Sequence, residues 1–220
     1  MDRKKEIISL ILGFLGSMLG LIGVAAFNQY ILMSLPLIVR MIMMIAAYWA
    51  IVIAPVIIMI CDKNPLSEYG FCREHILRQI LTGVVLGLAL SAVFTVTPHL
   101  FGFGEYFDSG KRYSYLWQYI YEFAYCIIAV GFAEELVFRG FIYTKFKAVF
   151  GTEISAVIGS SVLFGLFHIL GGNIGQIFMT GFLGVLWCLC RIKIKDCSIL
   201  SLIIMHGVYD ALITVWSNVL

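Results

Sequence analysis

The sequence predicts an all-α fold, a polytopic transmembrane bundle of about seven helices. Of the 220 residues, 61% are hydrophobic and 13% are charged, whereas a soluble domain is about 45–50% apolar and about 25% charged. The mean hydropathy is +0.99. Apolar stretches of about 20 residues, the length that crosses a hydrocarbon core of about 30 Å, recur over the whole length. They leave no room for a separate soluble domain.

Seven apolar stretches are the candidate helices: 7–27, 36–60, 79–98, 115–148, 153–170, 174–190 and 198–218. The first follows a basic segment but has no clear cleavage site, so we expect a retained helix rather than a signal peptide. Pro55 should kink the second. The fourth is longer than one crossing needs. We expect an N-terminal part of three helices, residues 1–114, and a core of four helices, residues 115–218.

The basic residues predict the orientation. Only Lys111 and Arg112 fall on one side of the predicted helices, and Arg40 and Arg139 fall at or within the membrane. The other side carries eleven of the fifteen Lys and Arg residues: Arg3, Lys4, Lys5, Lys63, Arg73, Arg78, Lys145, Lys147, Arg191, Lys193 and Lys195. By the positive-inside rule that side is cytoplasmic. We therefore expect a multi-pass membrane protein with a cytoplasmic N-terminus.

Two other compositional features exclude common roles. The net charge of +2 gives no indication of nucleic-acid binding. The expected partner, given the hydrophobic composition, is the lipid bilayer. The six cysteines fall in or beside predicted helices, most of them on the reducing side, where disulfides are rare. Cys188, Cys190 and Cys197 have no histidine close by, which speaks against a structural zinc site.

Two adjacent carboxylates, Glu134 and Glu135, lie inside the fourth helix with Arg139. An ionisable group in hydrocarbon costs at least ~2.5–3.5 kcal/mol, so such groups persist mainly where they pair or do chemistry. Glu135 and Arg139 are four residues apart and can form an ion pair on one helix face. Glu134 is rotated by about 100° from Glu135 and is left for another task. Glu122, nearer the outer end, is expected at the membrane interface.

Three further polar residues lie in predicted helices, namely His168, His206 and Asp210. His206 and Asp210 are four residues apart and therefore share a helix face. The simplest interpretations are structural: an ion-pair network for the glutamates, a core histidine for His168, and an intrahelical pair for His206 and Asp210.

Depth in the membrane tests whether these groups can meet. Glu134 lies 11 residues before Lys145, roughly 16 Å at ~1.5 Å per residue. By the same count His206 lies roughly 16 Å from Lys195, and His168 roughly 22 Å from Glu153. All three reach the middle of the membrane only if the fourth helix continues past Arg139.

A carboxylate and an imidazole that share a water can remove its proton and make a nucleophile. A second histidine and a polar group across the cavity can stabilise the oxyanion of an attacked carbonyl. The set therefore suits hydrolysis of a peptide or ester. Zinc held by Glu134, His168 and His206 is an alternative, although H-E-x-x-H is absent. A proton relay in a transporter is another, although no internal repeat is visible.

These residues resemble the CPBP (CAAX prenyl protease and bacteriocin-processing, or Abi) family of intramembrane proteases. The family pattern is E-E-x-x-x-R, then F-x-x-x-H, then H-x-x-x-N or H-x-x-x-D. This chain has Glu134-Glu135-Leu136-Val137-Phe138-Arg139, Phe164-Gly165-Leu166-Phe167-His168 and His206-Gly207-Val208-Tyr209-Asp210. The three motifs occur in order on separate predicted helices.

The resemblance implies a helical bundle with a polar cavity open to the cytoplasmic side, and residues 115–218 as its catalytic core. It implies Glu134 and His168 as the pair that activates water, and His206 with Asp210 as oxyanion stabilisers. Glu135 and Arg139 would be structural support. It implies a glutamate-type peptidase without a required cofactor, zinc being the lesser alternative. The substrate would be a lipidated or membrane-delivered peptide, and the setting a bacterial cell membrane.

Asp210 departs from the asparagine of the eukaryotic members. An ionised Asp cannot donate to an oxyanion, so Asp210 is either protonated or orients His206. In a bacterial member the substrate would be a bacteriocin or signalling-peptide precursor, with self-immunity as a role. A non-proteolytic immunity or scaffold protein of the same fold is the other alternative.

Overall fold

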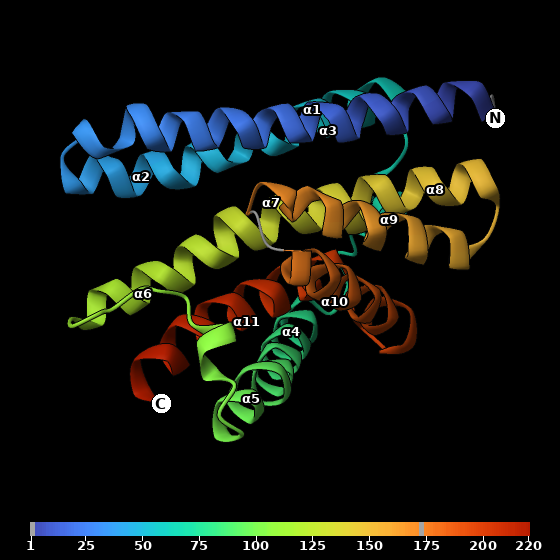
Figure 1. Ribbon diagram of the computed structural model, residues 1–220. Coiled ribbons are helices and arrows are strands. Elements are labelled where there is room, and N and C mark those ends of the chain that lie inside the picture. The colour runs from blue at the N-terminus through green and yellow to red at the C-terminus, as the bar shows by residue number, and fades with distance from the viewer. Residues whose placement is uncertain (1–2, 172–173) are drawn as a thin grey trace. The chain divides into compact units, whose positions relative to one another are not determined.

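The computed structural model describes residues 3–171 and 174–220, and within these ranges it is helical and has no strand (Figure 1). Six of its helices are long and apolar enough to cross a membrane: Arg3–Ser34, Leu37–Asp62, Ile76–Leu100, Glu153–Gly171, Ile174–Lys193 and Ile199–Val219. They coincide with six of the seven expected helices. The seventh, predicted at 115–148, is not among these six but is helical from Leu116 to Phe150. The all-α, polytopic fold is confirmed.

The helices form two compact units, and each draws on both the N-terminal and the C-terminal part of the chain. The first unit comprises Met1–Cys72 and Ala133–Lys195, and the second Arg73–Phe132 and Asp196–Leu220.

In the first unit the α-helices are α1 (Arg3–Tyr30), α2 (Leu37–Tyr48), α3 (Ile53–Asp62), α7 (Phe132–Glu135, from its second residue), α8 (Tyr143–Phe150), α9 (Glu153–Phe167) and α10 (Ile174–Lys193). In the second unit they are α4 (Ile76–Ser91), α5 (Thr97–Leu100), α6 (Leu116–Tyr125) and α11 (Ile199–Val219).

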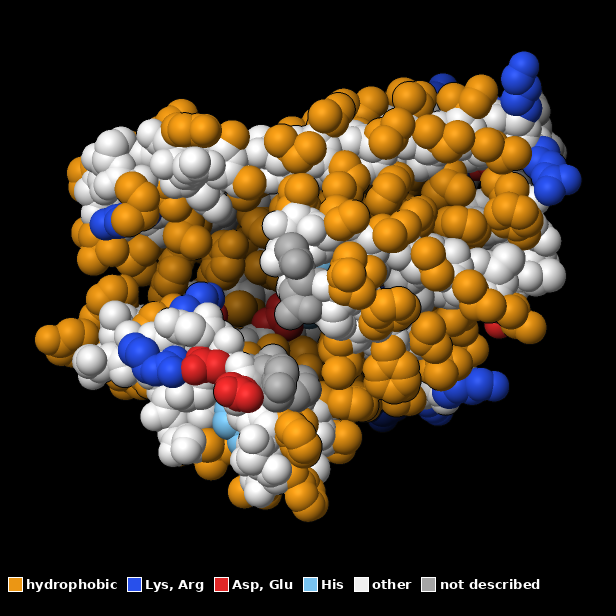
Figure 2. All heavy atoms as spheres, in the orientation of Figure 1, with side chains coloured by type: hydrophobic (Ala, Val, Ile, Leu, Met, Phe, Trp, Pro, Cys, Tyr) orange, Lys and Arg blue, Asp and Glu red, His pale blue; other side chains and the backbone are white. Residues whose placement is uncertain are grey.

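Small residues let α1 approach its neighbours in the first unit. A Cβ added at Gly16 would lie 2.3 Å from Ala54 Cβ, and one added at Gly20 would lie 2.7 Å from the Ala50 carbonyl oxygen. Such close backbone approach is typical of membrane helices, where van der Waals contact drives association. The side of α1 that faces outward is apolar, and Figure 2 shows hydrophobic side chains along it, with Lys and Arg gathered near the N-terminus.

Lys145 of α8 is buried rather than exposed at a membrane boundary. Its side chain is 2% exposed, and its Nζ lies 2.6 Å from Glu6 Oε2 and 2.5 Å from Asp62 Oδ2. Two carboxylates from α1 and α3 thus neutralise the ammonium, which makes its burial tolerable. The network links the first turn of α8 to both helices.

Close backbone contacts also hold the second unit together. Gly83 and Gly87 of α4 approach α11, where an added Cβ would lie 2.6 Å from Ser201 O and 2.8 Å from Met205 O. α11 also crosses a π-helical segment, Cys126–Gly131, at Gly207. A Cβ at Gly207 would lie 2.5 Å from Ile127 Cα. This crossing places His206, which precedes Gly207, within the packed core of the unit.

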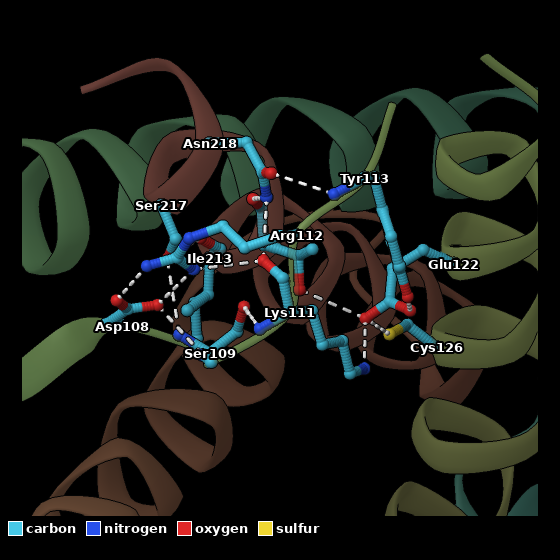
Figure 3. A network of polar contacts seen from close by, with 12 residues as sticks. Asp108, Ser109, Lys111, Arg112, Tyr113, Glu122, Cys126, Ile213, Ser217 and Asn218 are labelled. Carbon is cyan, nitrogen blue, oxygen red and sulfur yellow. Dashed lines mark hydrogen bonds and ion pairs between the residues drawn. The ribbon is translucent and has the colours of Figure 1, made fainter. Parts of the chain in front are cut away.

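Glu122 is buried in the second unit, and Figure 3 shows polar side chains around its carboxylate. Its carboxylate accepts from Lys111 Nζ at 2.5 Å, Tyr113 Oη at 2.7 Å and Thr214 Oγ1 at 3.1 Å. A cation and two hydroxyls compensate its desolvation, which sequence spacing did not indicate.

The loop that supplies Lys111 and Tyr113 is also hydrogen-bonded to the end of α11. The Tyr113 backbone N–H donates to Asn218 Oδ1, and that of Ser109 donates to Ser217 Oγ. Within the loop, the Arg112 guanidinium holds the pKa of the Asp108 carboxyl well below its usual range.

Because α11 crosses the π-helical segment closely at Gly207, we expect one methyl group added there to lower the stability of the protein. Gly207→Ala places a Cβ against the Ile127 backbone, and we expect a loss of about 1–3 kcal/mol of unfolding free energy. The matched control is Gly23→Ala, because a Cβ at Gly23 meets nothing within 4 Å. That variant should gain about 0.5–1 kcal/mol from its reduced backbone entropy. Unfolding in mixed SDS micelles measures both, and equal stabilities would contradict the packing described.

Candidate active site

The helix that carries the glutamate pair runs past Arg139, as the depth comparison required. Helical residues follow one another from Leu116 through Phe150. Two of its segments are π-helical, Cys126–Gly131 and Leu136–Ile142, and Glu134 and Glu135 lie between them. π-helical turns occur frequently at functional sites. No feature of the sequence indicated them.

Glu134 and His168 face each other in the first unit. Glu134 projects from α7 and is 2% exposed. His168 follows directly after α9 and opens a 3-10 turn, His168–Gly171. Its Nε2 lies 4.0 Å from Glu134 Oε2. The structure therefore places side by side the two residues to which the family resemblance assigns water activation.

A backbone contact defines the tautomer of His168. Its Nδ1 lies 2.9 Å from the Phe164 carbonyl oxygen. Because a carbonyl only accepts, Nδ1 carries the proton, and Nε2 of the neutral imidazole presents a lone pair. Nε2 and Glu134 Oε2 are then two acceptors, separated by more than a hydrogen bond. One molecule with two O–H donors, such as water, can bridge them.

Glu135 and Arg139 form the expected ion pair, with Arg139 Nη1 3.1 Å from Glu135 Oε1 and both side chains fully buried. The Arg139 guanidinium also lies over the Phe164 ring, 4.1 Å from its centroid. Phe164 in turn accepts from His168 through its carbonyl oxygen. The ion pair is thus connected through Phe164 to the position of the imidazole, which gives the phenylalanine of the F-x-x-x-H motif two structural tasks.

Tyr48 is a site residue that sequence reasoning missed. Its hydroxyl donates to Glu134 Oε1 at 2.5 Å, across 86 residues of sequence. Tyr48 is the last residue of α2 and belongs to no motif. The one signal in the sequence was Pro55, which predicted an irregularity in that helix.

His206 and Asp210 both lie on α11 in the second unit. His206 Nε2 is 3.3 Å from Asp210 Oδ2, one turn apart on α11. The His206 side chain is 6% exposed and that of Asp210 is 28% exposed. This contact favours the interpretation in which Asp210 orients His206.

The zinc alternative draws its ligands from both units. Within either unit, the described residues contain no group of three or more His, Cys, Asp or Glu side chains that could hold a metal ion. Glu134 and His168 alone supply two ligands, whereas a catalytic zinc site uses three from the protein.

Residues 115–212 match the family model described as type II CAAX prenyl endopeptidase Rce1-like. The match covers less than half of the chain. It includes every site residue expected from the motifs: Glu134, Glu135, Arg139, His168, His206 and Asp210. It confirms the family resemblance and supports the fold of a CAAX-protease-like intramembrane protease. No curated protein and no solved structure matches the chain significantly.

Removal of the buried Arg139 cation should reveal the free-energy cost of burying the Glu135 carboxylate. Arg139→Met leaves the Glu135 carboxylate buried without its partner, for which we expect a loss of about 3–5 kcal/mol of unfolding free energy. The double variant Glu135→Gln/Arg139→Met removes both charges and should lose clearly less. Unfolding in mixed SDS micelles compares the two. A double variant at least as unstable as Arg139→Met would show that the pair is not the source of the effect.

Proposed function

We propose that the chain is an intramembrane endopeptidase whose nucleophile is a water activated by Glu134 and His168. The proposal proceeds from the match of residues 115–212 to the model of type II CAAX prenyl endopeptidases, Rce1-like. The observation that carries the proposal is the 4.0 Å separation of Glu134 Oε2 and His168 Nε2. A water that donates two hydrogen bonds of about 2.8 Å can bridge two acceptors at this separation.

The proposed chemical steps follow from the positions of two hydrogen-bond acceptors, Glu134 Oε2 and His168 Nε2. Glu134 takes a proton as the water oxygen bonds to the scissile carbonyl carbon, and His168 accepts the second hydrogen bond and orients the attack. The tetrahedral intermediate then collapses with cleavage of the C–N bond. The proton held by Glu134 passes to the leaving amine, so that one peptide and one water yield a carboxylic acid and an amine. The acid then gives its proton to the amine, which leaves a carboxylate and an ammonium group.

We assign oxyanion stabilisation to His206, with Asp210 as its orienting partner. An imidazole with a carboxylate at one nitrogen can donate from its other nitrogen once it is protonated. The 3.3 Å contact between His206 Nε2 and Asp210 Oδ2 supports this division of roles. Glu135 and Arg139 support the site indirectly. The Arg139 guanidinium packs on the Phe164 ring, and the Phe164 carbonyl oxygen accepts from His168.

A membrane-delivered peptide, with an apolar side chain or a lipid group near its C-terminus, is the proposed substrate. A cavity of about 290 Å³ in the first unit supports an apolar ligand group, because most of its lining is apolar: Val56, Met59, Ile60, Leu66, Phe71 and Leu136, with Tyr69, Lys63 and Asn64. Leu136 lies two residues after Glu134. We further propose a cytoplasmic N-terminus in a bacterial cell membrane, and a bacteriocin or signalling-peptide precursor as the cleaved chain.

Glu134→Gln tests the mechanism most simply. The amide still accepts from Tyr48 but cannot remove a proton from water, so we expect peptide cleavage to fall by about 10²–10⁴-fold. The assay uses the purified protein in liposomes with quenched fluorescent peptides carrying a farnesylated C-terminal cysteine. Glu153→Gln is the control, since Glu153 is exposed and pairs with Lys147 at the surface.

Wild-type cleavage rates in the Glu134→Gln variant would exclude glutamate as the base. Protection of cells from a bacteriocin by both the wild type and Glu134→Gln, with no cleavage by either, would favour the scaffold alternative. Metal analysis and chelation of the same preparations test the zinc alternative. If zinc is required, activity should be lost when the metal is removed and restored when zinc is added.

A further inference from the structure

We propose that Tyr48 is a positioning residue for the general base, holding Glu134 Oε1 so that Oε2 remains directed at His168 and the water between them. The inference rests on the proposed function of Glu134. Tyr48 lies outside residues 115–212, so the family match does not assign it. Its hydroxyl donates to Glu134 Oε1 at 2.5 Å, while Oε2 is the oxygen 4.0 Å from His168 Nε2.

The two oxygens of Glu134 therefore have different surroundings. The last torsion of a glutamate side chain is broad and roughly two-fold, so the chain alone does not define the plane of the carboxylate. A hydroxyl group that donates to a carboxylate forms a short, charge-assisted hydrogen bond. With Oε1 engaged in this way, the carboxylate cannot turn without breaking that bond. The contact thus selects Oε2 as the basic oxygen.

The position of Tyr48 results from an interruption of the helix that carries it. α2 ends at Tyr48, a 3-10 turn occupies Trp49–Val52, and α3 begins at Ile53. Pro55 has no N–H, and its ring crowds the carbonyl of the residue four before it, Ile51. An uninterrupted α-helix through this point is therefore disfavoured, and the tighter turn takes its place.

Packing against α1 then holds the interruption in place. The 3-10 turn lies against Gly20, where an added Cβ would be 2.7 Å from the Ala50 carbonyl oxygen and 2.9 Å from Ile51 Cα. Ile51 is fully buried. Tyr48 is thus presented by a rigid junction of helices rather than by a loop, which is what the positioning of a base requires.

The test compares Tyr48→Phe with the wild type in the peptide assay. Phenylalanine keeps the ring and removes the donor, so we expect kcat to fall about tenfold to a hundredfold with KM and the melting temperature almost unchanged. Tyr143→Phe is the matched control, since Tyr143 is also buried in the first unit and no hydrogen bond from its hydroxyl to Glu134 is seen among the described residues. It should keep the wild-type kcat.

A double variant makes the test specific to Glu134. If Tyr48 acts only through that carboxylate, Tyr48→Phe/Glu134→Gln should be no slower than Glu134→Gln alone. A further loss in the double variant, an unchanged kcat in Tyr48→Phe, or a fall in its melting temperature that accounts for the lost activity would each overturn the inference. The proposed function fails separately, namely if Glu134→Gln itself cleaves at the wild-type rate.

Discussion

The burial of the Glu134 carboxylate is the constraint on which the rest of the site depends. A carboxylate within a membrane must be compensated by donors or do chemistry, and here one oxygen accepts from Tyr48 while the other faces His168. The neighbouring Glu135 is compensated differently, by a guanidinium four residues on. Two adjacent residues of one type thus have separate surroundings, Glu134 beside a tyrosine hydroxyl and an imidazole and Glu135 beside a guanidinium.

The same requirement explains features remote from the site. Lys145 is buried only because Glu6 and Asp62 converge on it, and Glu122 only because Lys111, Tyr113 and Thr214 donate to it. Each network joins helices that are distant in the sequence. In a membrane, where apolar surface contributes little to association between helices, such networks and the close approach at glycines hold each unit together.

The sequence predicts those features that follow from local spacing. The helices follow from hydropathy because an apolar chain of this length crosses a membrane only as helices or as a closed barrel. The Glu135–Arg139 pair follows from the four-residue spacing, and the meeting of Glu134 with His168 from motif and depth. Tyr48 could not be predicted, because its contact spans 86 residues and depends on how α2 is interrupted. Likewise the donors to Glu122 come from a loop and a distant helix, so spacing gave no indication of its burial.

The most direct test of the account is an experimental structure of the wild-type protein at a resolution that shows ordered water. The account predicts one oxygen within about 3 Å of both Glu134 Oε2 and His168 Nε2, with the Tyr48 hydroxyl on Oε1. A direct hydrogen bond between Glu134 Oε2 and the imidazole, which leaves no room for that oxygen, would contradict it. So would a metal ion bound by both side chains.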